Sequence, residues 1–527
     1  MLTTKRIGRA VLASILLMAF LVTLTNGATG AANPPTGGTL VYVRSADSNF
    51  LDPGFSSITE DLDVAVNVFD TLVTSTEDGR IIPALATAWQ NTGNKVWTFQ
   101  LRKGVKFHNG TPFTAKDVVF SLGRHKEGSS LFSYPGRTSA LRLWMGDLIE
   151  SVDAQGDYEV RITLRKPYAV FLHVLASYPA SIVSKDAAEK AKDGYAMWPV
   201  GTGPFQMSEW SKGDKLVLTR NRNYWGTEGP YLDRVVYKVV PDPSSRLLEL
   251  KAGSGSFVKG ILADQRQIVE NDPNLKLLIK PASSVGYLAM NVTKAPFDNV
   301  LVRRAINHAI DKKAILDSII GGLGSIPNSL IPDWMPEYSA KVEPYEYNPT
   351  KAKALLAQAG FPNGFKTELW TFNVERPFIP NVVQVAEKIK ADLAAVGIDA
   401  RLSIIDSTVY WKSINTLQHQ IAMKGWYTPP LADFLVRVAR LGAEAATGYP
   451  ETTRGKELVA LADAASQTDD IARRNKIYAD IQRIYAEDAP DVPLLHAAYV
   501  WAHSKTFKNV SISPDGLTRF AEVYYAK

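Results

Sequence analysis

A strand, a helix and a second strand follow one another with short connections between residues 367 and 405. Residues 367–372 (TELWTF) and 398–405 (IDARLSII) have the pattern of strands, and 382–397 between them has the apolar spacing of an amphipathic helix. Two strands joined through a helix lie parallel in one sheet. This part of the chain is therefore expected to be an α/β domain, whose ligands bind beyond the carboxyl ends of the strands.

Two proline-stiffened loops leave the carboxyl ends of strands in this region. NVERPFIPN (373–381) follows the first strand and carries Arg376, and GWYTPPLADF leaves a predicted strand at 420–426 and presents Trp426 and Tyr427. Proline lacks an N–H donor and fixes φ, so neither a helix nor an interior strand continues through these loops. A cation beside aromatic walls predicts a binding crevice. The plainer interpretation, a solvated Arg376 and a core Trp426, is favoured by residue statistics alone.

The first part of the chain, to about residue 210, has the pattern of short strands separated by turns. Residues 38–43, 95–102 and 156–164 are predicted strands, and 113–122 is a predicted helix with Thr114 as its N-cap. The chain thus combines a strand-rich first part with a later part in which helices and strands alternate.

The N-terminal residues have the order of a secretory signal peptide. Three cationic residues within the first nine precede an apolar run at 10–24 and then small residues, with cleavage expected after Ala32 or after Ala28. An uncleaved anchor helix is the alternative, which the shortness of the run disfavours. The chain has no cysteine, so it has neither disulfides, nor thiolate metal sites, nor a lipidated cysteine anchor. These features predict a periplasmic protein that is not a lipoprotein.

The charge balance makes nucleic acid and anionic membrane poor partners. The chain has 59 Lys and Arg, and removal of the three in the signal peptide leaves 56 against 53 acidic residues. No basic block or arginine-rich helix stands out. Solutes and proteins are therefore the expected partners.

Motifs of catalysis and metal binding are not found. The seven histidines are scattered, and the chain contains no HExxH, no Walker A loop and no GxSxG elbow. A convergent triad of distant residues stays open, but no pattern argues for one. The protein is expected not to be an enzyme and to need no cofactor or metal.

Several stretches together resemble one family, the extracytoplasmic solute-binding proteins of family 5 (the peptide, dipeptide and nickel group), which are the receptors of ABC importers. They are PALATAW (83–89), WTFQLRKGVKFHNGTPFTAKDVVFSL (97–122), VGTGPF (200–205), LTRNRNYWG (218–226), AMNVTKAPFDNVLVRRAINHAIDK (289–312), YNPTKAKALLAQAGFPNGF (347–365) and EDAPDVPLL (487–495). The resemblance covers nearly the whole chain after the signal peptide, in order.

The resemblance implies a two-lobed α/β periplasmic binding protein (type II, cluster C-like) with an extra domain inserted in the first lobe. On this sequence it implies a signal peptide at 1–32, lobe I from 33–80, 203–282 and 497–527, an inserted domain at 81–202, and lobe II at 283–496. A hinge between the lobes is expected near Ser284 and Leu495.

The resemblance also assigns roles to the two loops. RPFIPN resembles a stretch of dipeptide receptors whose arginine binds the ligand carboxylate, and that residue here is Arg376. Pro429 stands where peptide receptors carry the aspartate that binds the free amine of the ligand. Either Asp433 or Asp70, which lies in VFDTLV beside Thr71, supplies the missing carboxylate, or the ligand has no free amine. Asp433 as a solvated surface acid is the alternative.

The function that these observations predict is that of a periplasmic receptor for a carboxylate-bearing, peptide-like or amino-acid-conjugate solute. The expected ligand-binding residues are Arg376, Trp426, Tyr427, Asp433, Asp70 and Thr71. The receptor is expected to be a monomer that closes on its ligand and delivers it to the transmembrane subunits of an ABC permease. The alternatives are a receptor for an oligosaccharide or another non-peptide solute, a periplasmic enzyme, and a sensory adaptor.

Overall fold

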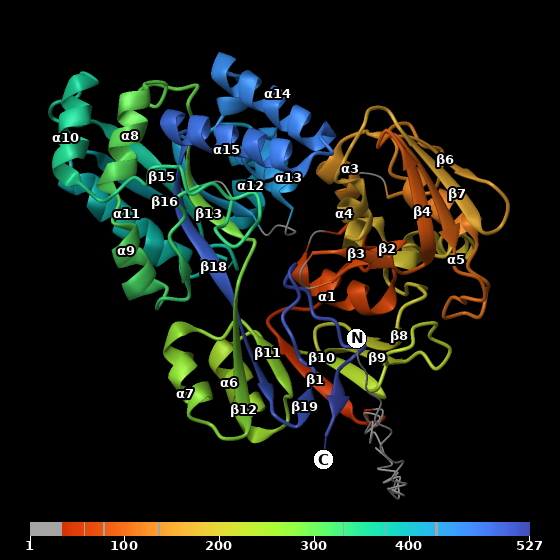
Figure 1. The fold of residues 1–527 in the computed structure, drawn as a ribbon. Helices are drawn as coiled ribbons and strands as arrows, with labels where there is room; N and C mark the ends of the chain where they lie inside the picture. Colours follow the sequence, from red (N-terminus) through yellow and green to blue (C-terminus); the bar gives the residue numbers. More distant parts are fainter. Residues whose placement is uncertain are drawn as a thin grey trace, which may run out of the picture. The chain divides into compact units, whose positions relative to one another are not determined.

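A computed structural model of the chain describes residues 34–56, 58–76, 79–134, 137–329, 331–374, 376–426 and 431–526 (Figure 1). The chain divides into two compact units, residues 1–34 and residues 35–527, and the fold below is that of the second unit. The predicted signal peptide, Tyr427 and Pro429 lie outside the described residues. In the part of the chain that the structure describes, every helix is too short or too polar to span a membrane.

A twelve-stranded mixed sheet carries most of the strands. Ten of them follow one path, in the order β16 (Asp399–Ile405), β15 (Lys366–Phe372), β17 (Ile421–Trp426), β13 (Val285–Met290), β18 (Asp491–Ser504), β11 (Phe257–Lys259), β1 (Thr39–Arg44), β10 (Arg234–Val239), β9 (Lys215–Arg220) and β8 (Phe205–Ser211). Two more, β12 (Leu275–Pro281) and β14 (Gly324–Ser325), also pair with β18.

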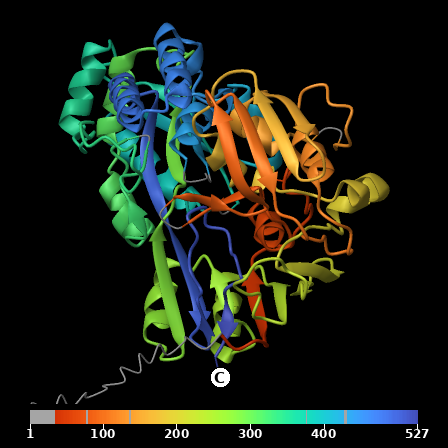
Figure 2. The same cartoon turned by 45° about the vertical axis from the view of Figure 1, so that its right-hand side comes forward.

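The long strand β18 belongs to both halves of this sheet (Figures 1 and 2). Its first residues pair with β13, with Leu495 opposite Gly286, and its later residues pair with β12 and β11, with Ala498 opposite Pro281. β12 and β13 are themselves joined by residues 282–284 only. Two strand connections, close to the predicted crossings, therefore join the halves.

The predicted strand–helix–strand unit is confirmed. β15 and β16 are parallel in register from Lys366 opposite Asp399 to Phe372 opposite Ile405, and α11 (Val382–Ala395) connects them. β15 is also parallel to β17, which in turn is antiparallel to β13. The strands β15 and β17 therefore point the same way, and the loops that follow them leave the same edge of the sheet.

A four-stranded antiparallel sheet forms a separate layer. Its order is β4 (Ala86–Thr92), β5 (Val96–Leu101), β7 (Glu159–Leu164) and β6 (Ile149–Ala154). The predicted helix after Thr114 is α2 (Ala115–Gly123), and Thr114 forms a capping box with Asp117. The sequence-based predictions for this region are confirmed.

The remaining helices and short strands surround these sheets. The helices are α1 (Thr59–Val68), α3 (Ala140–Met145), α4 (Phe171–Leu175), α5 (Lys185–Ala191), α6 (Pro243–Ala252), α7 (Arg266–Glu270), α8 (Val300–Ala309), α9 (Lys312–Ala314), α10 (Pro349–Gln358), α12 (Ser407–Asn415), α13 (Ala432–Phe434), α14 (Thr453–Gln467) and α15 (Ile471–Asp488). The short strands are β2 (Val73–Ser75), β3 (Ile81–Pro83), β19 (Phe507–Lys508) and β20 (Tyr524–Tyr525).

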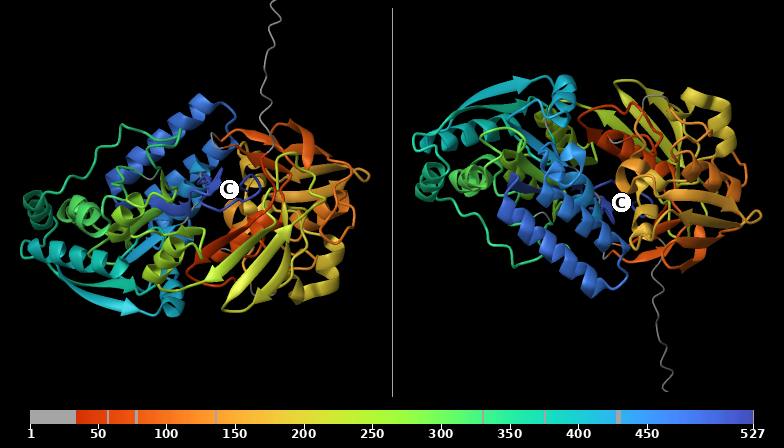
Figure 3. Two further views of the ribbon diagram at one scale, coloured as in Figure 1. Left: turned by 90° about the horizontal axis from the view of Figure 1, so that it is seen from below. Right: turned by 90° about the horizontal axis from the view of Figure 1, so that it is seen from above.

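One apolar core joins segments that are far apart in the sequence. Trp97 and Phe99 of β5 belong to the same buried cluster as Phe434 of α13. Beside this cluster the backbone N–H of Ala169, which precedes α4, donates to the carbonyl of Ser466 on α14 at 2.7 Å, and in Figure 3 the blue helices lie beside the orange segments. We call these contacts the α13–α14 junction.

Candidate functional site

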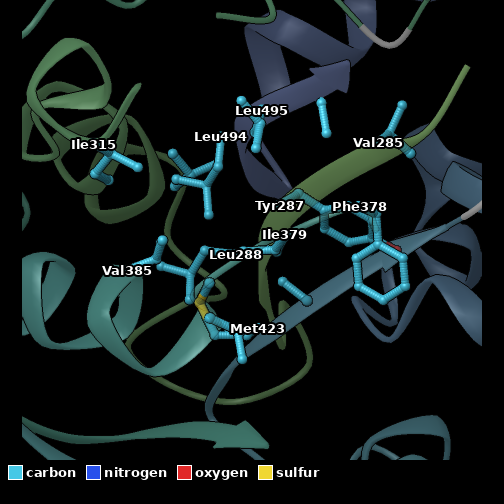
Figure 4. Close-up of a cluster of buried hydrophobic side chains, with 14 of the residues drawn as sticks. Val285, Tyr287, Leu288, Ile315, Phe378, Ile379, Val385, Met423, Leu494 and Leu495 are labelled. Carbon is cyan, nitrogen blue, oxygen red and sulfur yellow. The ribbon is translucent and has the colours of Figure 1, made fainter. Parts of the chain in front are cut away.

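The loop after β15 packs directly on the end of β17 because two glycines leave room for it. A Cβ on Gly425 would lie 2.2 Å from Cδ2 of Phe378, and one on Gly286 would lie 2.4 Å from Cγ1 of Ile379. Both distances are far below van der Waals contact, so these positions require glycine. Figure 4 shows Phe378 and Ile379 beside the strand that carries Val285 and Tyr287. The loop after β15 therefore lies against the end of the strand from which the second predicted loop leaves.

Trp411 on α12 lies at the centre of the residues that these loops bring together. Its ring centroid is 5.8 Å from Cζ of Arg376 and 5.0 Å from Nζ of Lys424. The ring of Phe378 lies 6.5 Å away, centroid to centroid. We call Arg376, Phe378, Trp411, Lys424 and Trp426 the Trp411 site.

Arg376 presents a guanidinium that has no carboxylate partner among the described residues. Its side chain is partly buried, and within the described segments it has no carboxylate within 4.0 Å and no hydrogen-bond acceptor. The stacked indole of Trp411 is its contact, and the N–H of Ile379 donates to its carbonyl at 3.1 Å. A guanidinium held on an aromatic face is suited to a planar anion.

Lys424 is a second cation in the Trp411 site, and the sequence-based prediction missed it. Its side chain is 4% exposed, and Nζ donates to Oδ1 of Asn415 at 3.2 Å. Nζ also lies 5.1 Å from the ring of Trp426, which points to the same side of β17 because the two residues are two apart in a strand. That spacing is the signal that could have found Lys424 from the sequence.

Trp426 lies between two cores. It packs against the large core around β13 and β17 and against the core of the four-stranded layer, with the ring of Phe434 at 5.9 Å. Its indole Nε1 is buried and has no acceptor among the residues that are described. The alternative of a core tryptophan thus describes much of its surroundings, although Nζ of Lys424 also lies over its ring.

Asp433 is buried in the α13–α14 junction, so the alternative of a solvated surface acid is wrong. Its carboxylate is 1% exposed, accepts from the hydroxyl of Tyr168 at 2.5 Å and lies 3.6 Å from Arg437. Burial raises the pKa of Asp433, and the charge of Arg437 and the hydrogen bond from Tyr168 oppose that rise. The partners of Asp433 therefore come from the protein itself.

Asp70 is held by residues of two of the sequence motifs. Its carboxylate accepts from Thr202 Oγ1 and Trp225 Nε1, both at 2.8 Å, and from the Tyr224 hydroxyl at 3.3 Å. Burial raises the pKa of Asp70, and these three hydrogen bonds oppose the rise. The Thr71 hydroxyl donates to the carbonyl of Val73 at 2.6 Å. The hydrogen bonds to Asp70 link the VFDTLV motif to the VGTGPF and NRNYWG motifs. These motifs therefore have a structural role.

Metal ligands do not gather in the described segments: no group of three or more His, Asp or Glu is placed to hold an ion. Five of the seven histidines are buried, among them His496 and His419. His496 Nδ1 lies 3.1 Å from the carbonyl of Ser284, and His419 Nε2 lies 2.9 Å from that of Ala446. Burial lowers the pKa of each to about 4, so both are neutral at pH 7.

Comparison with known proteins gives one family over most of the chain. Residues 80–437 match the bacterial extracellular solute-binding proteins, family 5. The dipeptide-binding protein of Escherichia coli is 33% identical over 461 residues, which cover 84% of this chain and 86% of that protein. The heme-binding protein A of Haemophilus influenzae is 33% identical over 460 residues, covering 84% and 83%.

A solved structure gives the same family. The periplasmic binding protein DppA from Helicobacter pylori, in complex with the peptide STSA, is 34% identical, with a TM-score of 0.81, and the match covers 94% of this chain and 99% of that one. Its fold and the fold of this chain are thus alike over nearly their whole length, and the two-lobed α/β architecture is confirmed. The chain belongs to the bacterial extracellular solute-binding proteins of family 5.

Proposed function

We propose that this protein is the periplasmic receptor of an ABC importer and captures a peptide-like or amino-acid-conjugate solute through a carboxylate of that solute. The names of its relatives support this: they are described as binding dipeptides and di- or tripeptides, and one structure holds the peptide STSA. Other relatives are described as binding heme or glutathione. The class of receptor is thus better supported than the ligand.

The guanidinium of Arg376, which has no carboxylate partner in the described part of the chain, carries the assignment of a carboxylate. Its planar fork can donate to both oxygens of a carboxylate, and such bidentate pairs are among the strongest hydrogen-bonded contacts in proteins. Phe378 and Ile379 fix the loop, so the loop loses little freedom when a ligand binds. Oδ2 of Asp433 accepts from Tyr168 and lies 3.6 Å from Arg437, and Oδ1 is buried without a partner among the described residues. Because Arg437 already offsets its charge, we do not assign Asp433 as the amine-binding aspartate. A ligand without a free amine fits this arrangement.

Closure of two lobes is the proposed mechanism of capture. Lobe I comprises 33–80, 203–282 and 497–527, with the inserted domain at 81–202, and lobe II comprises 283–496. The strand connections at 282–284 and within β18 serve as the hinge. A ligand that contacts both lobes binds the closed form better and shifts the equilibrium toward it, and the permease then engages that form. Neither a chemical step nor a cofactor is part of this function.

The proposed location follows from the signal peptide. Cleavage after Ala32 releases a protein without a cysteine, and hence without a lipid anchor on cysteine. The receptor acts as a monomer in the periplasm, where it meets the transmembrane subunits of the permease.

Binding to paired ligands tests this function. The protein is unfolded and refolded to remove co-purified ligand, and thermal shifts are measured with dipeptides whose amine, carboxylate or both are blocked. A ligand at a hundred times its Kd adds about 2.7 kcal/mol of stability, which gives a clear shift. Amine-blocked dipeptides are expected to bind and carboxylate-blocked ones are not.

Arg376→Gln is expected to weaken binding of the best carboxylate ligand by at least about 30-fold, because a charge-assisted pair is lost. Arg401→Gln is the control, since Arg401 is an exposed residue that pairs with Glu368 on β15. If carboxylate-blocked ligands bind equally well, or if Arg376→Gln has no effect, the carboxylate assignment fails. Binding of a neutral oligosaccharide that survives Arg376→Gln would support the alternative receptor class.

A further inference from the structure

Polar side chains of the segment 81–202, the proposed inserted domain, pair with side chains of proposed lobe II at the α13–α14 junction. The Tyr168 hydroxyl donates to Oδ2 of Asp433 at 2.5 Å. Nζ of Lys166 lies 3.2 Å from Oδ2 of Asp463. Both contacts join parts of the chain that are far apart in sequence, and neither belongs to the strand connections that form the proposed hinge.

The backbone of the same segment adds to these contacts. The N–H of Ala169 donates to the carbonyl of Ser466 at 2.7 Å, and Nδ2 of Asn94 donates to Oδ1 of Asp469. The carbonyl of Asn94 accepts from the N–H of Tyr168 at 3.0 Å. Two loops of the segment 81–202 are therefore bonded to each other as well as to the end of α14.

Apolar side chains from the two sides bury one another at the junction. Phe434 and Val438 are 2% and 9% exposed and belong to the same core as side chains of β5 and α4. The ring of Trp144 on α3 lies 5.2 Å from that of Phe434. Separation of the two sides would expose these groups to water, which is unfavourable. This stabilisation comes from side chains of the protein itself and requires no contact with a ligand.

The junction also lies next to the Trp411 site. The loop that follows Trp426 leads directly into α13, and the rings of Trp426 and Phe434 are 5.9 Å apart. Trp426 packs against the core of lobe II and against the core that contains the junction. Formation of the junction therefore restricts a side chain that is expected to bind the ligand.

We infer that the segment 81–202 acts as a latch: its contacts at the α13–α14 junction hold lobe II, so that part of the receptor is closed before a ligand binds. This inference rests on the proposed function, because it gives the inserted domain a role in closure of the lobes. A rotation that separates the lobes must break the junction, since its two sides belong to different lobes. A ligand enters the open form, so the latch slows both association and release.

Distances between two spin labels test the latch in the full-length mature protein, which has no cysteine of its own. The labels are attached at Gln90→Cys on β4 and Lys476→Cys on α15, both exposed positions. Without ligand, a short and a long distance are expected, and the best amine-blocked dipeptide should enrich the short one. A long distance alone in the ligand-free protein, shortened only by ligand, would overturn the latch and leave the proposed function intact.

Variants then assign the short distance to the junction. Lys166→Met combined with Tyr168→Phe should lower the ligand-free ratio of closed to open molecules at least about fivefold and speed association of the dipeptide. Lys166→Met alone should act in the same direction. Lys116→Met is the matched control, because Lys116 pairs with Asp186 at 3.0 Å within the segment 81–202. An unchanged ratio in the double variant would overturn the latch, whereas failure of the unaltered protein to bind any dipeptide would refute the proposed function.

Discussion

Gly425 sets the position of the loop after β15 by having no side chain. Phe378 occupies the space where a Cβ would be, and Arg376 lies only two residues before Phe378. The position of the Arg376 guanidinium therefore depends on a residue that has no side chain. A glycine has no functional group, so its effect on the position of Arg376 could not be inferred from the residue type.

Gly425→Ala should lower the free energy of unfolding by about 1–3 kcal/mol, since the new methyl group overpacks the contact with Phe378. Because the loop must move, binding of carboxylate ligands should weaken as well. Denaturant unfolding and calorimetry measure the two effects. Gly194→Ala is the control, since a Cβ there meets nothing within 4 Å. An unchanged affinity in Gly425→Ala would show that the loop position does not depend on this glycine.

The parts of the site that could be predicted were those fixed by local sequence. Arg376 and Trp426 follow strands whose alternation is visible in the sequence, so their loops could be placed at one sheet edge. Lys424 could have been found from its spacing of two residues to Trp426 in a strand, but Trp411 could not, because its contact with Lys424 joins α12 to β17 and no local pattern reports it. Asp433 could not be assigned because its partner Tyr168 is 265 positions away in the sequence.

Contacts between distant elements are concentrated at the α13–α14 junction. Tyr168, which precedes α4, donates to Asp433 of α13, and Lys166 pairs with Asp463 of α14 at 3.2 Å. The ring of Trp144 on α3 lies 5.2 Å from that of Phe434. The junction therefore combines an apolar contact with a buried hydrogen bond to a charged group, which is costly to break.

Tyr168→Phe should lower the free energy of unfolding by about 1.5–3 kcal/mol, because a buried carboxylate loses a charge-assisted hydrogen bond. Tyr158→Phe is the matched control, since the Tyr158 hydroxyl has no hydrogen-bond partner among the residues described. Urea unfolding of both variants checks the expectation. Equal stabilities would mean that water or Arg437 fully replaces the hydroxyl.

At the scale of the whole molecule, buried neutral histidines make stability depend on pH. His419 and His496 are 1% and 6% exposed, and burial lowers the pKa of each to about 4. In the unfolded chain both return to about 6.5, so between pH 6.5 and 4 the unfolded state binds more protons. Their contribution to stability is therefore complete above pH 6.5 and is lost as the pH falls toward 4.

For each of these histidines, acidification from pH 7 to pH 4.5 is expected to lower the free energy of unfolding by about 2–3 kcal/mol. Buried carboxylates with raised pKa, such as Asp433, act in the opposite direction, so the test compares variants. The variant His419→Gln, unfolded in urea at both pH values, should lose less stability on acidification than the unaltered protein does. An identical loss would show that His419 is protonated without cost in the folded state.

The place of β18 in the sequence has a consequence for biosynthesis. β18 follows every other strand of the twelve-stranded sheet along the chain, yet it lies between β13 and β11 in the middle of that sheet. Until residues 491–504 have been synthesised, neither half of the sheet has its central partner, and the two halves have no strand in common. A nascent chain therefore cannot complete this sheet before its last segment has been synthesised. That order suits the export proposed above, since a chain that crosses a membrane through a secretion channel must be unfolded.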